Sequence, residues 1–207
     1  MVLAIEVVLF DLGGVLIELG GMGDMASFAN EPDESKLWRR WLECPWVRRY
    51  ERGLCDSQSF AQGMVDSWAM DVSAEEFLEA FTSWPRGLFP GARELIQSID
   101  VGNDNGLEIA CFSNTNELHA DRDADRFGIG ELFETRFFSH EMGMLKPDRE
   151  AFEFVVAALG RPADAILFLD DNEINVRGAR AAGLRAERAS GLDESRAILA
   201  KNGLLRA

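Results

Sequence analysis

The chain has few cysteines, few histidines and too few basic residues to balance its acidic ones. Each shortage excludes a class of protein. The three cysteines, Cys44, Cys55 and Cys111, lie too far apart for a disulfide framework or a zinc site, which favours a reducing cytoplasm. The 21 basic residues face 36 acidic ones, so the formal charge is −15. This charge argues against nucleic acid or an anionic membrane as a partner, whereas a bound cation can still attract a small anionic substrate.

Long apolar runs are absent as well. No run approaches the length that crosses a membrane, and the N-terminus lacks the basic region and the long apolar core of a signal peptide. The 207 residues are enough for one well-buried domain, or for a domain with a sizeable insertion. We expect a monomer or a homodimer.

One short apolar run, Val7–Phe10, leads directly into Asp11. It predicts a strand over 5–10 that is buried on both faces of a parallel sheet. Ligands of such sheets bind at the carboxyl ends of the strands, so Asp11 is a candidate functional residue. The alternative is that Asp11 caps a loop or a helix. Residues 12–21 hold four glycines and are predicted to form a flexible flap.

Strands and helices are predicted to alternate along most of the chain. The further strands are expected over 107–112, 135–139, 165–169 and 185–188, the last at an edge. The helices are expected over 91–99, 117–126, 148–159, 174–182 and 193–203. This alternation predicts an α/β fold with a doubly wound, parallel, Rossmann-like sheet.

Residues 20–85 interrupt this alternation with helical periodicity. Four of the five tryptophans lie in this stretch between positions 38 and 68, and Phe60, Met64 and Trp68 recur at the i, i+4 spacing. We predict a small all-helical domain of three or four helices, inserted after the first strand. Its aromatic stripes are interpreted as packing among the helices. The core domain is then expected to comprise 1–19 and 86–207.

Polar residues follow the predicted strands where these end, and parallel strands bring those ends to one crevice. Two aspartates with a backbone carbonyl and waters suit Mg²⁺, and a hydroxyl with amides and a lysine suits a phosphate. The simplest chemistry is attack of an aspartate on phosphorus, followed by hydrolysis of the aspartyl-phosphate. The residues concerned are Asp11, Ser113-Asn114-Thr115-Asn116, Lys146 and Asp170-Asp171.

Several of these residues also have a structural role open to them. Lys146 could be a solvated residue at the start of a helix, and Ser113 or the pair Asp170-Asp171 could cap the helices that follow them. His119 and His140 are expected to be structural, because no partner lies at metal-ligand spacing.

A basic cluster, Arg48-Arg49 with Arg52, stands out in this acidic chain. It either pairs with Glu43 and Glu51 on the surface, or it enters the crevice and binds substrate. Arg49 and Arg52 are the substrate-binding candidates.

Four motifs, in this order, resemble those of the haloacid dehalogenase-like (HAD) hydrolase superfamily, and the helical insertion resembles its helical cap. The Tyr50-Glu51-Arg52-Gly53 segment and three of the motifs are also similar to bacterial sugar phosphatases of the group that includes α-D-glucose-1-phosphate phosphatase. The four motifs are Phe10-Asp11-Leu12-Gly13-Gly14-Val15, Ser113-Asn114-Thr115-Asn116, Gly143-Met144-Leu145-Lys146-Pro147 and Leu169-Asp170-Asp171-Asn172.

The resemblance implies a Mg²⁺-dependent phosphatase acting on a small phosphorylated metabolite such as a sugar phosphate. It implies Asp11 as the nucleophile and Lys146 as the residue that neutralises charge on the phosphate. Ser113 and Asn114 would bind the transferring phosphoryl group. The metal ligands would be Asp11, Asp171, Asp170 and the backbone carbonyl of Gly13.

Gly13 departs from the usual pattern of the superfamily, in which a second aspartate protonates the leaving oxygen and then activates water. Such acid–base help is typically worth about 10²–10⁴-fold in rate. The sugar phosphatases that the chain resembles also have glycine here. Two hypotheses follow. Either the enzyme prefers good leaving groups such as anomeric phosphates, or a cap residue or the substrate handles the proton.

Two other functions remain open. A metal-free carbon–halogen hydrolase would use Asp11 to displace halide, but paired acids such as Asp170-Asp171 have little use in a metal-free site. A degenerate binding protein would bind metal and phosphate without turnover. The presence of Asp11, Lys146 and Asp171 argues against that.

Overall fold

A five-stranded parallel sheet forms the centre of the computed structural model, which describes residues 4–20, 22–101, 106–120 and 127–206. The strand order is β5-β4-β1-β6-β7, and all four pairings are parallel. This confirms the predicted α/β class, including the edge strand. The strands are β1 (Val7–Phe10), β4 (Glu108–Ser113), β5 (Thr135–Phe138), β6 (Ile166–Asp170) and β7 (Arg185–Arg188).

Helices cover both faces of the sheet, which explains why β1 is apolar at every position. Val8 and Phe10 pack with α6, α8 and α12, whereas Val7 and Leu9 pack with α10 and α11 on the other face. All four side chains are fully buried. The remaining short helices are α9 (Ser139–Met142) and η1 (Ala163–Ala165). The covering helices are α6 (Ala92–Gln97), α8 (Ile129–Leu132), α12 (Gly191–Lys201), α10 (Arg149–Leu159) and α11 (Glu173–Ala181).

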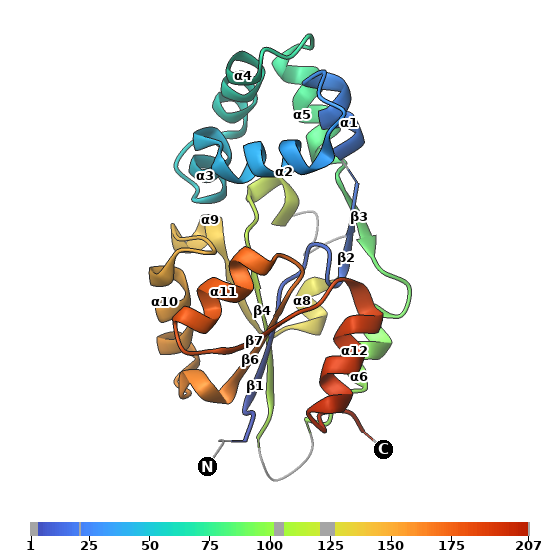
Figure 1. Ribbon diagram of the computed structural model, residues 1–207, viewed down its shortest axis with the longest axis vertical. Helices are drawn as coiled ribbons and strands as arrows, with labels where there is room; N and C mark the ends of the chain where they lie inside the picture. The colour runs from blue at the N-terminus through green and yellow to red at the C-terminus, as the bar shows by residue number, and fades with distance from the viewer. Residues whose placement is uncertain (1–3, 21, 102–105, 121–126, 207) are drawn as a thin grey trace.

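Five helices between residues 22 and 82 form a separate layer, which we call the cap (Figure 1, top). Three or four were predicted. The chain has an additional break at Pro45, which starts a new helix because proline lacks the N–H that would continue the old one. The cap has its own apolar cluster around Phe60 and Phe77. The domain boundaries at 19/20 and 85/86 stay a prediction. The cap helices are α1 (Met22–Phe28), α2 (Glu34–Glu43), α3 (Pro45–Glu51), α4 (Ser57–Trp68) and α5 (Ala74–Thr82).

Two strands that the sequence did not predict join the cap to the core. β2 (Ile17–Leu19) pairs antiparallel with β3 (Pro85–Leu88). The prediction of a flexible flap is therefore wrong for this part of 12–21, because Val15, Leu16 and Ile17 are buried in the core rather than free.

The helix predicted over 117–126 is observed over 117–120, and the rest lies outside the described residues. Within the ranges that the structure describes, no helix is long and apolar enough to span a membrane.

Candidate active site

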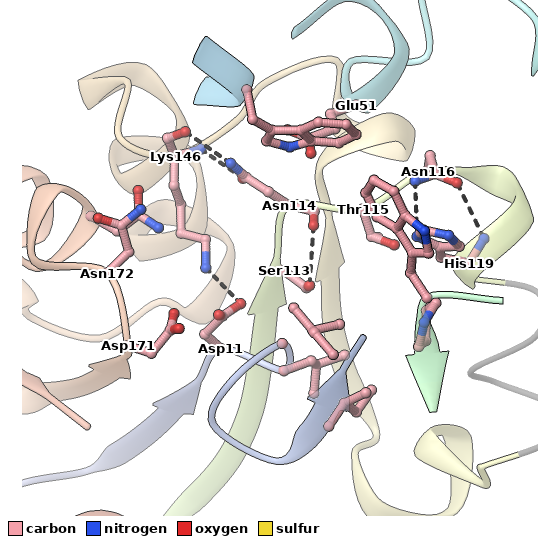
Figure 2. A pocket seen from close by; sticks show the side chains of 18 of the residues that line it. Asp11, Glu51, Ser113, Asn114, Thr115, Asn116, His119, Lys146, Asp171 and Asn172 are labelled. Carbon is pink, nitrogen blue, oxygen red and sulfur yellow. Dashed lines mark hydrogen bonds and ion pairs between the residues drawn. The ribbon is translucent and has the colours of Figure 1, made fainter. Parts of the chain in front are cut away.

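Lys146 joins two aspartates at the carboxyl edge of the sheet. Asp11 follows β1 and Asp170 ends β6, and the pairing of Phe10 with Leu169 places these carboxylates side by side. The Lys146 Nζ lies 2.8 Å from Asp11 Oδ1 (Figure 2). It also lies 2.6 Å from Asp170 Oδ2 and donates to the Phe112 carbonyl at 2.9 Å. Lys146 is 2% exposed, so it is a buried residue between two aspartate side chains and not a solvated one.

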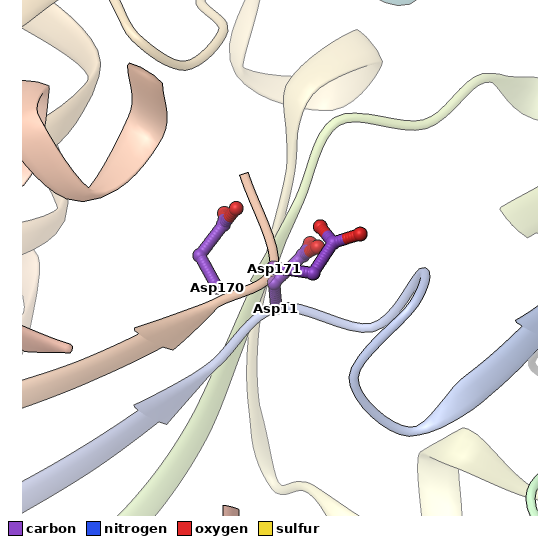
Figure 3. A group of neighbouring side chains, drawn as sticks. All are labelled: Asp11, Asp170 and Asp171. Carbon is purple, nitrogen blue, oxygen red and sulfur yellow. The ribbon is translucent and has the colours of Figure 1, made fainter. Parts of the chain in front are cut away.

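Three carboxylates form the one acidic cluster among the described residues that could hold a metal ion. One oxygen each of Asp11, Asp170 and Asp171 lies within 4.8 Å of the others (Figure 3). Asp170 already accepts hydrogen bonds from Lys146, from the Asn172 N–H at 2.8 Å and from Asn175 Nδ2 at 3.1 Å. Both of its oxygens are occupied, so Asp11 and Asp171 are the carboxylates left for a cation.

The crowding of these acids favours a cation at this place. Burial raises the pKa of Asp11 to about 8. Repulsion from Asp170 and Asp171 adds to this effect, and Lys146 opposes it. Burial, followed by repulsion from Asp170, also raises the pKa of Asp171 to about 6. A hard divalent cation with oxygen ligands would stabilise the charged forms, so the donor set fits Mg²⁺.

The glycines after Asp11 give this site room. Gly14 has φ +70°, and a Cβ there would clash with the Asp171 carboxylate, so only glycine lets that carboxylate approach. Gly13 lines the same pocket, and no backbone N–H of the described chain donates to its carbonyl oxygen. The carbonyl expected to face the metal is therefore unused by the fold.

The two candidate phosphate ligands after β4 differ in what they are free to do. The Asn114 side chain donates to the Lys146 carbonyl and accepts from the Lys146 N–H, both at 2.9 Å, so it positions the lysine segment. The Ser113 hydroxyl makes one long contact, 3.5 Å to the Asn114 carbonyl, and remains able to donate to a phosphate.

Neighbouring residues make the helix-capping hydrogen bonds that were considered for Ser113 and for the pair Asp170-Asp171. Asn116 Oδ1, not the Ser113 hydroxyl, accepts from the N–H of His119. Asn172, not the Asp170-Asp171 pair, caps α11 by accepting from the Ile174 N–H at 2.9 Å. Ser113 and Asp171 are thus left for other roles.

Aromatic side chains form the opposite wall of a cavity of about 430 Å³, the size of a small-molecule site. Their interpretation as packing among helices is half correct. Trp41 and Phe81 belong to the cap cluster and also line the cavity, and Trp38 lines it while 38% exposed. The cap wall consists of Trp38, Trp41, Leu42, Glu51, Phe81 and Trp84.

Neither Arg49 nor Arg52 lines this cavity, in contrast to the expectation that they bind substrate. Arg52 pairs with Asp148 on the core, and so does Arg48, at 2.8 Å. Arg49 lies over the Trp46 ring, with its guanidinium carbon 5.1 Å from the ring centroid. Asp148 thus pairs with two of the three arginines, although it lies about a hundred residues from them in the sequence.

Glu51 is a titratable pocket residue that was not among the predicted site residues. It ends α3, one residue after Tyr50, and lines the cavity together with Asp11 and Lys146. The one available signal was the Tyr50-Glu51-Arg52-Gly53 segment, which the sequence analysis quoted only as part of the resemblance.

Comparison with known proteins shows the family of the chain. The family model described as haloacid dehalogenase-like hydrolase matches residues 5–183. A phosphoglycolate phosphatase of Pseudomonas savastanoi pv. phaseolicola is 30% identical over 207 residues, covering 95% of this chain and 74% of that protein. The pyrimidine 5'-nucleotidase YjjG of Escherichia coli is 26% identical over 146 residues, covering 67% of this chain and 63% of that protein.

Solved structures share the architecture. The magnesium complex of the HAD family enzyme BT-2542 from Bacteroides thetaiotaomicron matches with a TM-score of 0.72 at 25% identity, covering 94% of this chain and 98% of that one. The L-2-haloacid dehalogenase of Xanthobacter autotrophicus, with chloropropionic acid covalently bound, matches with a TM-score of 0.64 at 19% identity, covering 98% and 85%. The second likeness is one of fold alone.

Proposed function

Because the chain belongs to the haloacid dehalogenase-like hydrolase family, we propose that it is a Mg²⁺-dependent phosphatase in which Asp11 attacks the phosphorus of a small phosphorylated metabolite. It is a hydrolase, as the motifs predicted. The observation that carries the proposal is the position of Asp11 at the end of β1, with Lys146 Nζ at 2.8 Å and Asp171 in the same acidic cluster.

The residues suited to hold the metal are Asp11, Asp171 and the carbonyl of Gly13. When bound, Mg²⁺ supplies positive charge to the phosphate oxygens and to the attacking carboxylate. Asp170 holds Lys146 by accepting a hydrogen bond from its Nζ, and Asn175 holds Asp170 by donating to its carboxylate.

The chain's own residues supply the rest. Lys146 orients the Asp11 carboxylate, and the Ser113 hydroxyl donates to a phosphoryl oxygen. The bond from Asp11 to phosphorus forms as the bond from phosphorus to the substrate oxygen breaks, and water then hydrolyses the aspartyl-phosphate. The cap covers the site and limits the access of bulk water.

The organic part of the substrate is proposed to be neutral, as in a sugar phosphate. Lys146 is the one lysine or arginine among the described residues that line the cavity. The hydrogen bonds of His119, from Nε2 to the Phe81 carbonyl at 2.8 Å and between Nδ1 and Asn116 Nδ2 at 3.2 Å, fit a neutral ring. A carboxylate such as that of phosphoglycolate would therefore lack a second cation to bind.

The cap wall instead suits a sugar. Aromatic faces such as that of Trp38 pack against apolar C–H surfaces. The Trp84 side chain adds a further aromatic surface to this wall.

The test is phosphate release from a panel of sugar phosphates, including anomeric ones, with phosphoglycolate and nucleotides for comparison, in Mg²⁺ and in EDTA. We expect release from sugar phosphates that requires Mg²⁺ and is abolished in Asp11→Asn. Halide release from 2-haloacids in EDTA would establish the carbon–halogen hydrolase instead. Binding of metal and phosphate without turnover would establish a binding protein.

A further inference from the structure

The phosphatase proposed above lacks a proton donor on its core, because Gly13 stands where the family usually has an acid. We propose that Glu51, supplied by the cap, protonates the leaving oxygen and then deprotonates the attacking water. This inference rests on the proposed function and adds a catalytic residue to it.

The location of Glu51 matches this role. Its carboxylate lines the cavity from the cap side, whereas Asp11 and Lys146 line it from the core side, as Figure 2 shows. The nucleophile attacks phosphorus on the side opposite the leaving oxygen. A donor for that oxygen must therefore lie across the cavity from Asp11, on the wall that the cap provides.

The residues on either side of Glu51 hold it in this position. Tyr50 is 2% exposed and stacks on the Phe60 ring, with a centroid distance of 4.3 Å. Arg52 pairs with Asp148, two residues after Lys146. Gly53 adopts φ +66°, and a Cβ there would lie 2.5 Å from the His140 carbonyl oxygen. The end of α3 is thus fixed from one side by the cap core and from the other by the core domain.

The electrostatic environment leaves Glu51 able to exchange a proton. Within the described ranges, its carboxylate accepts no hydrogen bond and forms no ion pair. Burial raises its pKa to about 7, against the opposing effects of Arg48 and Lys146. The other titratable side chains lining this cavity are Asp11, His119, Asp171 and Glu173. A carboxyl group with a pKa near 7 can act as both acid and base at neutral pH.

The proton balance closes over one turnover. In the first half, Asp11 forms its bond to phosphorus, the ester bond breaks, and Glu51 gives its proton to the leaving oxygen, which departs as an alcohol. In the second half, the Glu51 carboxylate takes a proton from water as that oxygen bonds to phosphorus. The bond from Asp11 to phosphorus then breaks, which restores both residues.

The test compares Glu51→Gln with wild type on two kinds of substrate. Glu79→Gln makes the same change on the exposed face of α5 and serves as the control. On sugar phosphates with an alkoxide leaving group, kcat/KM of Glu51→Gln should fall about 10²–10⁴-fold. On 4-nitrophenyl phosphate, whose leaving group needs no proton, kcat/KM should stay within about threefold of wild type. Hydrolysis of the aspartyl-phosphate should then limit turnover, so 4-nitrophenol should appear in a burst of one per active site.

Three outcomes overturn the inference. They are an equal loss on both kinds of substrate, the absence of a burst, or a rise in KM alone, which would mean that Glu51 only binds the sugar. The wild-type pH profile gives a further check. Since the acid form is required for the first step, kcat/KM for sugar phosphates should fall above about pH 7, and Glu51→Gln should lack this fall. If wild type releases no phosphate that depends on Asp11, the proposed function itself has failed.

Discussion

The two walls of the cavity differ in how their polar groups are bound. The core wall is formed by residues of the core domain, among them Asp11, Ser113, Asn114, Lys146 and Asp171. On the core wall two central polar side chains are held by several partners: Lys146 contacts three oxygens, and the Asn114 side chain uses both its donor and its acceptor on Lys146. On the cap wall most of the surface is aromatic. Its one carboxylate, Glu51, has no hydrogen-bond partner in the described chain.

This difference separates chemistry from recognition. A fixed network of charges can stabilise the phosphoryl group of any substrate without reorganising during the reaction. Apolar faces such as that of Trp38, with few fixed polar groups, accept or reject the organic part by its shape and charge. Substitutions on the core wall should therefore remove activity on all substrates, whereas those of the aromatic residues on the cap wall should alter the choice among substrates.

Lys146→Met is expected to have the largest effect. It removes the cation between Asp11 and Asp170, so activity on every phosphate should be lost. Leaving buried carboxylates without their partner should also destabilise the metal-free protein by about 3–5 kcal/mol near neutral pH. The measurements are phosphate release and urea unfolding in EDTA at pH 7 and pH 9.

The pH dependence of this loss has a definite sign. Burial already raises the pKa of Asp11 to about 8, well above its unfolded value, and removing Lys146 raises this pKa further. An acid whose pKa is raised on folding contributes its stability below the unfolded pKa, and this contribution is lost as the pH rises. Wild-type Asp11 ionises near pH 8, whereas Asp11 of the variant ionises only at higher pH, so the deficit should be smaller at pH 7 than at pH 9. Lys201→Met, which removes a surface pair with Glu187 at 3.1 Å, should cost little at either pH. A deficit that does not change with pH would contradict this account of the core wall.

Gly14→Ala should have an intermediate effect that depends on the metal. The added Cβ clashes with the Asp171 carboxylate, so Mg²⁺ affinity should fall by roughly 10–100-fold, in the range seen when metal-site geometry is disturbed. Titration of activity with Mg²⁺ measures this.

Gly160→Ala is the matched control for this change. Gly160 has φ +63°, close to the φ +70° of Gly14, but a Cβ there meets nothing within 4 Å. Both variants should lose about 1 kcal/mol of stability from backbone strain, and only Gly14→Ala should need more Mg²⁺. If the two require the same Mg²⁺ concentration, Asp171 is not a metal ligand.

The core wall could largely be predicted from the sequence because the positions of the strands along the chain, and the residues at which they end, are local signals. An apolar run followed by Asp11, and a second followed by Asp170-Asp171, place these residues at one edge of any parallel sheet. Which of these residues binds substrate or metal and which holds Lys146 in place could not be predicted. That Asp170 holds Lys146 and that Asn114 holds the lysine backbone depends on hydrogen-bond geometry between segments 24 and 32 residues apart.

The cap was harder to predict because helical periodicity shows which residues share a face but not what that face meets. Trp41 packs inward and also lines the cavity, and Trp38 is partly exposed, although both follow one amphipathic pattern on α2. The end of α3, which carries Glu51, is held to the core domain because Asp148 pairs with Arg48 and Arg52. These contacts span about a hundred residues. No spacing within the cap contains that information.

Trp38→Ala should have the smallest effect and tests the cap wall directly. The side chain is already 38% exposed, so the free energy of unfolding should change little. Loss of its face should raise KM for sugar phosphates by about tenfold, which corresponds to roughly 1.4 kcal/mol of binding. The inhibition constant of inorganic phosphate should not change, because phosphate alone contacts the core wall. Leu54→Ala, at an exposed cap residue outside the cavity, should alter neither value. If Trp38→Ala weakens phosphate as much as it weakens sugar phosphates, the two walls do not divide binding as their construction indicates.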